Sequence, residues 1–228
     1  MTALSGLGGT TLDDLRPRLR GWLHFWAFVV SIGAGVALVT LAAIVGTRAA
    51  VGTAVYAVTV SGLFGVSALY HRREWGGRGR ALMKRLDHSM IFVFIAGTYT
   101  PFALLGMPRA LGEVILTVVW AGALSGIVIR QAWIRAPRWV TVPPYIALGW
   151  VAIFVLPQLL RHVGVASFVL LLAGGVVYTL GAIVYATRRP DPAPDTFGYH
   201  EVFHACTILA ATCHYVAVFM AVYSSPLH

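Results

Sequence analysis

The chain has 228 residues, of which 58% are hydrophobic and only 11% are charged, and its mean hydropathy is +0.79. About a quarter of the residues in a soluble domain are charged, so this composition excludes a soluble globular domain and predicts an integral membrane protein. The net charge of +9 does not indicate nucleic-acid binding, because the basic residues lie between apolar runs and form no basic face on a soluble module.

The chain divides into a polar, glycine-containing segment, residues 1–21, and a single transmembrane domain, residues 22–228. The first apolar run is too long for a cleavable signal peptide. Seven apolar runs follow, each near the ~20 residues that cross a bilayer. They cover residues 22–46, 51–70, 88–106, 111–129, 139–160, 165–187 and 203–223. Because backbone groups in lipid must be paired within a helix or a closed barrel, and barrel strands are shorter and alternating, the sequence predicts an all-α, seven-transmembrane helix bundle.

The basic residues predict the orientation of this bundle. With residues 1–21 in the cytoplasm, 14 of the 17 Lys and Arg residues fall in cytoplasmic segments, and only Arg48, Arg109 and Arg161 fall outside. Such an excess of cytoplasmic positive charge is typical of multi-pass proteins. The sequence therefore predicts a cytoplasmic N-terminus, an external C-terminus and a location in the plasma (inner) membrane.

The last apolar run opens with two histidines, His200 and His204. On a helix, residues four apart lie on one face about 6 Å apart along the axis, which suits two ligands of one transition metal, usually zinc. The alternative interpretation is a pair of histidines at a helix end that bond to water or to the backbone.

Other polar residues are expected at the same cytoplasmic depth. His71 ends the second predicted span, Ser67 lies one turn deeper on the same face, and Asp87 opens the third span. Ionisable residues near or within spans face the bundle interior and are candidate functional groups. Three histidines leave one position of a tetrahedral zinc for water, as in catalytic zinc sites. Asp87 would then act as a general base or hold that water.

Both of these polar residues also have simpler interpretations. Asp87 could pair with Lys84 or Arg85, or cap the third helix. Ser67 could bond to a carbonyl of its own helix.

The remaining histidines and the two cysteines are not expected in the metal site. His88 must point about 100° away from Asp87 and, like His24, is expected to be interfacial. His214 lies about 15 Å deeper than His204 and is expected to be a buried, hydrogen-bonded histidine. His162 and His228 are expected on the outer side, away from the site. Cys206 and Cys213 are expected to be unpaired, because they are too far apart along one helix for a disulfide.

Four stretches together resemble a known family. They are Ser-Ala-Leu-Tyr-His at 67–71, Leu-Asp-His-Ser-Met-Ile at 86–91, Ala-Gly-Thr-Tyr-Thr-Pro-Phe at 96–102, and Phe-Gly-Tyr-His-Glu-Val-Phe-His at 197–204. In order and spacing they resemble the hemolysin III family, which belongs with the progestin and adipoQ receptors, including the adiponectin receptors, in a group that also holds alkaline ceramidases. The resemblance covers residues 18–223. It implies a seven-helix bundle with zinc held by His71, His200 and His204, and with Asp87 and Ser67 near the water at the metal.

Three functional hypotheses follow. The leading one is a membrane-embedded, zinc-dependent hydrolase of a lipid amide or ester, with Asp87 and Ser67 as catalytic residues and membrane lipids as partners. The second is a lipid sensor or receptor in which zinc is structural. The third is a cytolysin, which the family name suggests but which fits poorly with seven committed apolar spans.

Overall fold

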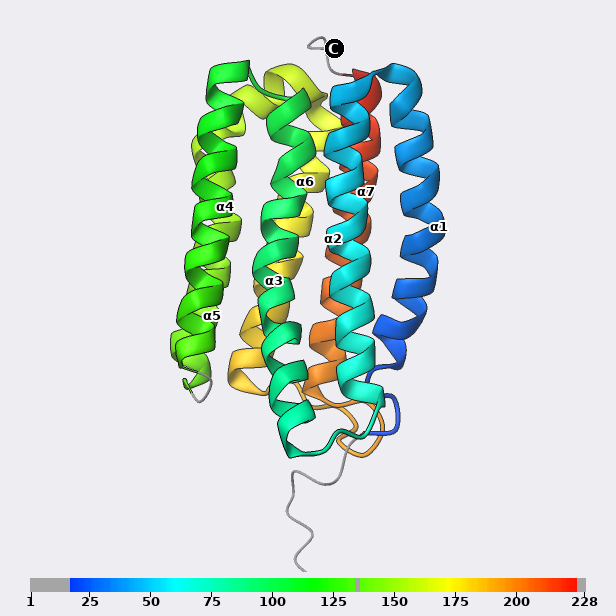
Figure 1. The fold of residues 1–228 in the computed structure, drawn as a ribbon, viewed down its shortest axis with the longest axis vertical. Helices are drawn as coiled ribbons and strands as arrows, with labels where there is room; N and C mark the ends of the chain where they lie inside the picture. Colours follow the sequence, from blue (N-terminus) through cyan, green and yellow to red (C-terminus); the bar gives the residue numbers. More distant parts are fainter. Residues whose placement is uncertain (1–16, 134–135, 225–228) are drawn as a thin grey trace, which may run out of the picture.

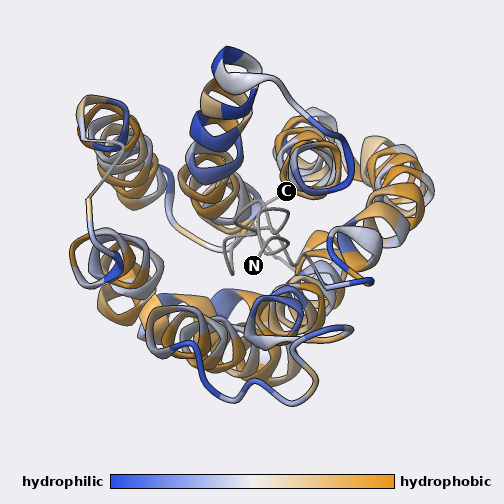
Figure 2. Cartoon of the chain, turned by 90° about the horizontal axis from the view of Figure 1, so that it is seen from below, coloured by the Kyte–Doolittle hydropathy of each residue, from blue (hydrophilic) through white to orange (hydrophobic). Residues whose placement is uncertain are grey.

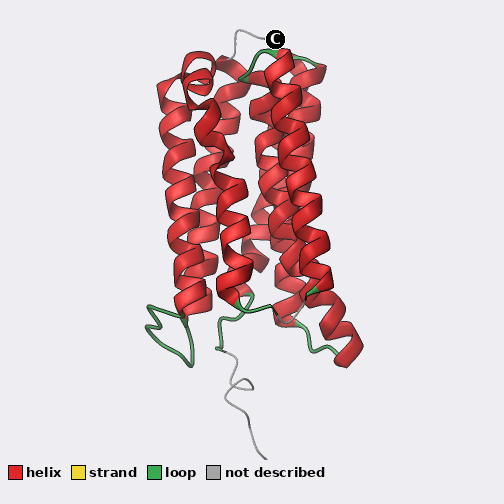
Figure 3. Ribbon diagram, turned by 90° about the vertical axis from the view of Figure 1, so that its left-hand side faces the viewer, coloured by secondary structure: helices red, strands yellow, loops and turns green. Residues whose placement is uncertain are grey.

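The computed structural model describes residues 17–133 and 136–224, and these form helices joined by short loops (Figures 1 and 3). The elements in chain order are α1 (Trp22–Val45), α2 (Thr47–Arg72), α3 (Gly77–Leu105), α4 (Arg109–Ala132), α5 (Arg138–Gly149), the short 3₁₀ helix η1 (Trp150–Val155), α6 (Leu156–Thr187) and α7 (Tyr199–Ser224). The prediction of an all-α membrane protein is confirmed.

Six helical segments of the described chain are long and apolar enough to cross a membrane. Five correspond to single predicted spans, and the sixth, Arg138–Thr187, contains the two predicted spans 139–160 and 165–187. The predicted count of seven is therefore not confirmed. Within the sixth segment, the backbone of Gly164 has φ 79° and ψ 164°, so the helix is interrupted there. A positive φ of this size favours glycine, which has no Cβ to clash.

Helix α3 begins at Gly77, well before the predicted start at His88. The extra turns carry Arg78, Arg80 and Lys84, and Arg and Lys are good helix formers. An apolar run marks only the part of a helix inside the hydrocarbon layer, so it underestimates a helix that continues into the headgroup region. Asp87 consequently lies inside a helix, and its predicted alternative role as a helix cap is wrong.

The helices pack mainly against their neighbours in sequence, and contacts between α1 and α7 close the bundle. Large apolar side chains cover its outer surface; Ile44 and Phe154, for example, are 80% and 82% exposed. In a soluble protein such a surface would aggregate, whereas in a bilayer it faces lipid. Figure 2 looks along the bundle from the end where α2 and α3 meet and α7 begins, and hydrophilic residues gather in the loops and helix tips at this end.

A close crossing of α2 and α3 sets the geometry of that end. A Cβ atom at Gly97 would lie 2.1 Å from Thr59 Oγ1, and one at Gly62 would lie 2.8 Å from the terminal methyl of Met90. The two helices can approach this closely because each contributes a residue without a side chain. Following the antiparallel pair toward the α2 C-terminus brings Ser67 beside Asp87.

Candidate metal centre and its cavity

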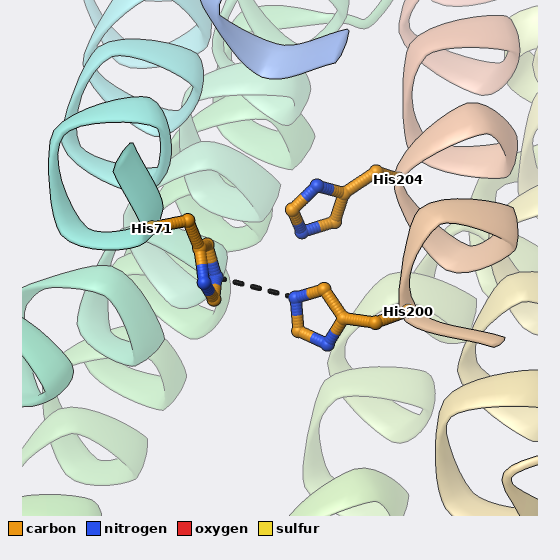
Figure 4. A group of neighbouring side chains, drawn as sticks. All are labelled: His71, His200 and His204. Atoms are coloured by element: carbon orange, nitrogen blue, oxygen red, sulfur yellow. Dashed lines mark hydrogen bonds between the residues drawn. The ribbon is translucent and has the colours of Figure 1, made fainter. Parts of the chain in front are cut away.

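The three predicted metal ligands come from two helices that meet at one end of the bundle. His71 lies in the last turn of α2, and His200 and His204 lie in the first two turns of α7. Figure 4 shows the three rings turned toward one another. Residues 71 and 200 are far apart in sequence, so only the packed bundle brings these side chains together.

The distances within this group, called the histidine trio below, suit a metal ion. One ligand atom from each ring lies within 4.8 Å of the other two, and His71 Nε2 lies 3.2 Å from His200 Nε2. Zinc–nitrogen bonds of about 2.0–2.1 Å at tetrahedral angles place ligand nitrogens ~3.3 Å apart. His204 is buried, and its Nδ1 has no hydrogen-bond partner among the described residues. The trio is therefore a group of three nitrogen ligands that could hold a metal ion.

A fourth histidine, His24, contacts the trio without belonging to it. Its ring stacks on that of His204 with a centroid distance of 3.7 Å and an interplanar angle of 8°. A metal ion lies close to the ring plane of each histidine that binds it, and two parallel stacked planes do not share such a point. His24 is only 2% exposed, so the prediction of an interfacial histidine is wrong. A continuous apolar run does not indicate which face of α1 packs against the other helices.

Asp87 and Ser67 lie together near the trio, as their predicted depths suggest. The Ser67 hydroxyl interacts with the Asp87 carboxylate, and both side chains line one cavity. The Asp87 carboxylate also lies 3.5 Å from His88 Nδ1. His88 lines the same cavity as Asp87, although adjacent helical positions predict side chains that point about 100° apart. Both side chains are long enough to converge on one cavity despite that angle.

The trio, Asp87 and Ser67 line one cavity of about 480 Å³. Basic groups also line it, including Arg20, Lys84 and Arg138. Moving along the helices away from the trio, the wall becomes largely apolar and aromatic, with Leu63, Ile91, Phe94, Ile95, Val142, Trp150 and Tyr178. The cavity thus combines a polar end, lined by three histidines and a carboxylate, with a largely apolar interior, as is common in ligand-binding pockets.

Glu201 is a residue whose role the sequence analysis did not assign. His200, Glu201 and His204 have the H-E-x-x-H spacing in which the glutamate of many zinc proteases acts as a general base. Here Glu201 is fully buried, pairs with Arg20, and accepts a hydrogen bond from the Gly198 N–H at 2.9 Å. It does not line the cavity. Asp87 is thus the carboxylate that lines the same cavity as the trio.

Arg138 is a second residue that the sequence analysis did not assign to the site. Its guanidinium donates to the Tyr185 carbonyl and to the Tyr199 hydroxyl, at 3.1 and 3.0 Å. It also lies over the rings of both tyrosines. Positive charges at span ends are expected in any membrane protein, so the sequence does not distinguish Arg138 from the other cytoplasmic charges.

The other histidines and the two cysteines lie outside the histidine trio. His214 is buried, and its Nε2 lies 3.2 Å from the Leu171 carbonyl oxygen. His162 interacts with the Gln158 carbonyl and does not line the cavity. Cys206 and Cys213 are free thiols. His228 lies outside the described residues.

Comparison with known proteins adds the family. The sequence profile described as "Haemolysin-III related" matches residues 14–215, a range that includes the trio, Asp87 and Ser67. Hemolysin-3 of Bacillus cereus is 35% identical over 167 residues, which are 73% of this chain and 76% of that protein. Hemolysin-3 homolog of Bacillus subtilis is 36% identical over 108 residues, 47% of this chain and 51% of that protein.

A more distant similarity reaches animal proteins. Monocyte to macrophage differentiation factor of Homo sapiens is 23% identical over 176 residues, which are 75% of this chain and 71% of that protein. Six apolar helical segments and the profile match both indicate an integral membrane protein. With the profile covering most of its length, the chain belongs to the Haemolysin-III related family.

Proposed function

We propose that this protein is a membrane-embedded, zinc-dependent hydrolase that cleaves an amide or ester bond in a membrane lipid and so affects membrane lipid homeostasis. The observation that carries the proposal is one cavity with two chemical characters. Its polar end contains three converging histidines and Asp87, and its interior is apolar. A structural zinc site needs no carboxylate beside the metal and no cavity for a hydrocarbon chain.

In this proposal His71, His200 and His204 hold the zinc ion. When bound, zinc supplies a Lewis acid for the lipid carbonyl and an activated water molecule. Asp87 accepts a proton from the attacking water and passes it to the leaving amine or alcohol. Ser67 donates a hydrogen bond from its hydroxyl to Asp87 and so fixes the direction of the carboxylate. The apolar wall binds the acyl chain and excludes bulk water.

The zinc-dependent reaction is tested with purified protein reconstituted into vesicles. The substrates are a panel of lipid amides, including ceramides, and of phospholipid esters, and the readout is fatty-acid release. We expect release from at least one lipid class, its loss after chelation, and its recovery when zinc is returned. Fully zinc-loaded protein that releases no fatty acid from any lipid in the panel would contradict the proposal and favour the lipid-sensor hypothesis.

The proposal includes seven spans with a cytoplasmic N-terminus and an external C-terminus, in the plasma membrane. A straight helix over the 50 residues Arg138–Thr187 would extend about 75 Å, far more than the ~30 Å hydrocarbon core. The contacts between α5 and α6 support a chain that doubles back near Gly164, which gives two spans. The excess of basic residues at the trio's end of the bundle supports a cytoplasmic location for the metal centre.

This topology predicts the behaviour of two fusion proteins. A reporter active only in the cytoplasm should be inactive when fused after His228 and active when fused before Met1. The same reporter fused after Ala132, at the end of α4, provides a matched control, because that site is also expected to be cytoplasmic. An active C-terminal fusion would contradict the count of seven spans.

A further inference from the structure

A short segment before α1 lies against the loop that leads into α7. The Arg18 N–H donates to the Asp195 carbonyl at 3.1 Å, and the Leu19 N–H donates to the Thr196 carbonyl at 3.2 Å. The segment Pro17–Gly21 thus runs beside the start of the helix that carries His200 and His204. With the first turn of α1 it forms a unit, residues 17–24, that is called the N-terminal clamp below.

The clamp is joined to α7 by a partly buried ion pair between Arg20 and Glu201. The Glu201 side chain is fully buried, and its other oxygen accepts the Gly198 N–H. Breaking one partner of a buried ion pair leaves an uncompensated charge and is strongly destabilising. Since Glu201 follows His200 directly, this pair fixes the turn of α7 that presents both of its trio histidines.

The clamp touches α2 at His71, the trio residue of that helix. A Cβ atom at Gly21 would lie 2.9 Å from the His71 Cβ and 2.8 Å from the Arg72 Cγ, and Gly21 has φ +80°. Both the space and the backbone angle therefore require glycine. The Arg72 guanidinium lies 4.0 Å from the Trp22 ring centroid and 4.3 Å from that of Phe25, in cation–π contacts. These contacts hold the end of α2 against the clamp.

The last contact is the stack of His24 on His204. Within residues 20–24, Arg20 and His24 therefore contact α7, and Gly21 contacts α2. The two helices that carry the trio make few direct contacts with each other. The clamp touches both of them at the level of the trio.

We propose that the N-terminal clamp positions the metal ligands, by holding His71 of α2 and His200 and His204 of α7 at the separation that one metal ion needs. Arg20, Gly21 and His24 are positioning residues, and none of them binds the metal. The inference rests on the proposed zinc site and adds that residues outside the ligand set determine how long zinc is retained. Residues that orient metal ligands typically change metal affinity 10- to 100-fold when mutated.

The test measures zinc dissociation from purified, zinc-loaded full-length protein into excess chelator that carries a fluorescent readout. We expect Gly21→Ala and Arg20→Gln to lose zinc roughly 10- to 100-fold faster than wild type. Gly77→Ala and Arg78→Gln are matched controls from the same end of the bundle and should behave like wild type. A Cβ at Gly77 meets no atom within 4 Å, and Arg78 is exposed.

Two comparisons separate positioning from general loss of stability. His24→Phe keeps an aromatic ring on His204 and should retain zinc, whereas His24→Ala should not. If the ion pair acts as one unit, the double variant Arg20→Gln, Glu201→Gln should lose zinc no faster than the worse single variant. The thermal unfolding of each metal-free variant is recorded in parallel. These comparisons remain available even if Gly21→Ala does not fold.

The outcomes are distinguishable. Folded Gly21→Ala and Arg20→Gln proteins that release zinc at the wild-type rate would overturn the clamp and leave the zinc site intact. If His24→Phe and His24→Ala lose zinc equally fast, and both faster than wild type, then His24 acts through its nitrogens and its assigned role is overturned. Wild-type protein that binds no zinc would overturn the metal site and the clamp together.

Discussion

Asp87→Asn is expected to lower the rate of lipid hydrolysis by about 100-fold or more, while zinc remains bound and the fold is intact. Asparagine has nearly the shape of aspartate and still accepts a hydrogen bond, but it does not take up a proton. In the structure, the Asp87 carboxylate interacts with Ser67 and His88 in the cavity that the trio also lines. If its basicity drives the reaction, removing that basicity should abolish most turnover without removing the side chain from the cavity.

The measurement is fatty-acid release by reconstituted protein, with zinc and helical content quantified in the same samples. Glu113→Gln is the matched control, because it neutralises an exposed carboxylate that pairs with Arg109 on α4 and does not line the main cavity. Ser67→Ala should have a smaller effect, since it changes the orientation of the carboxylate and not its charge. Unchanged turnover in Asp87→Asn would remove Asp87 from the mechanism.

The sequence predicts the parts of this site that depend on local periodicity. Helical spacing places His200 and His204 on one face, and the length of the apolar runs places His71 and Asp87 at similar depth. The structure brings these residues together as expected. Such inferences succeed because lipid permits few backbone structures, so that position along a span translates into depth.

The features that sequence analysis missed depend on tertiary contacts or on helix outside the lipid. The early start of α3 at Gly77 is invisible in hydropathy, because the added turns are charged. Glu201 has the spacing of a metalloprotease base, and only the packed structure shows that it pairs with Arg20. His24 lies in an apolar run, and only the packing of α1 against α7 shows that its ring covers His204.

The second large effect concerns the metal itself. Removing any of the three trio histidines leaves two nitrogen ligands, too few for a stable tetrahedral zinc site. His71→Ala, His200→Ala and His204→Ala should therefore each lose most of their zinc. His162→Ala and His214→Ala should retain it, because His162 lies outside the cavity and the His214 ring bonds to the Leu171 carbonyl, about 15 Å along α7 from His204.

The central claim is that the histidine trio binds one zinc ion, and the zinc content of purified protein tests it most directly. Elemental analysis of detergent-purified wild type should find about one zinc ion per chain, with His162→Ala unchanged and the triple variant His71→Ala, His200→Ala, His204→Ala near zero. All samples are purified in parallel, and their helical content is compared to show that the triple variant is folded. Equal zinc content in wild type and a folded triple variant would contradict the account.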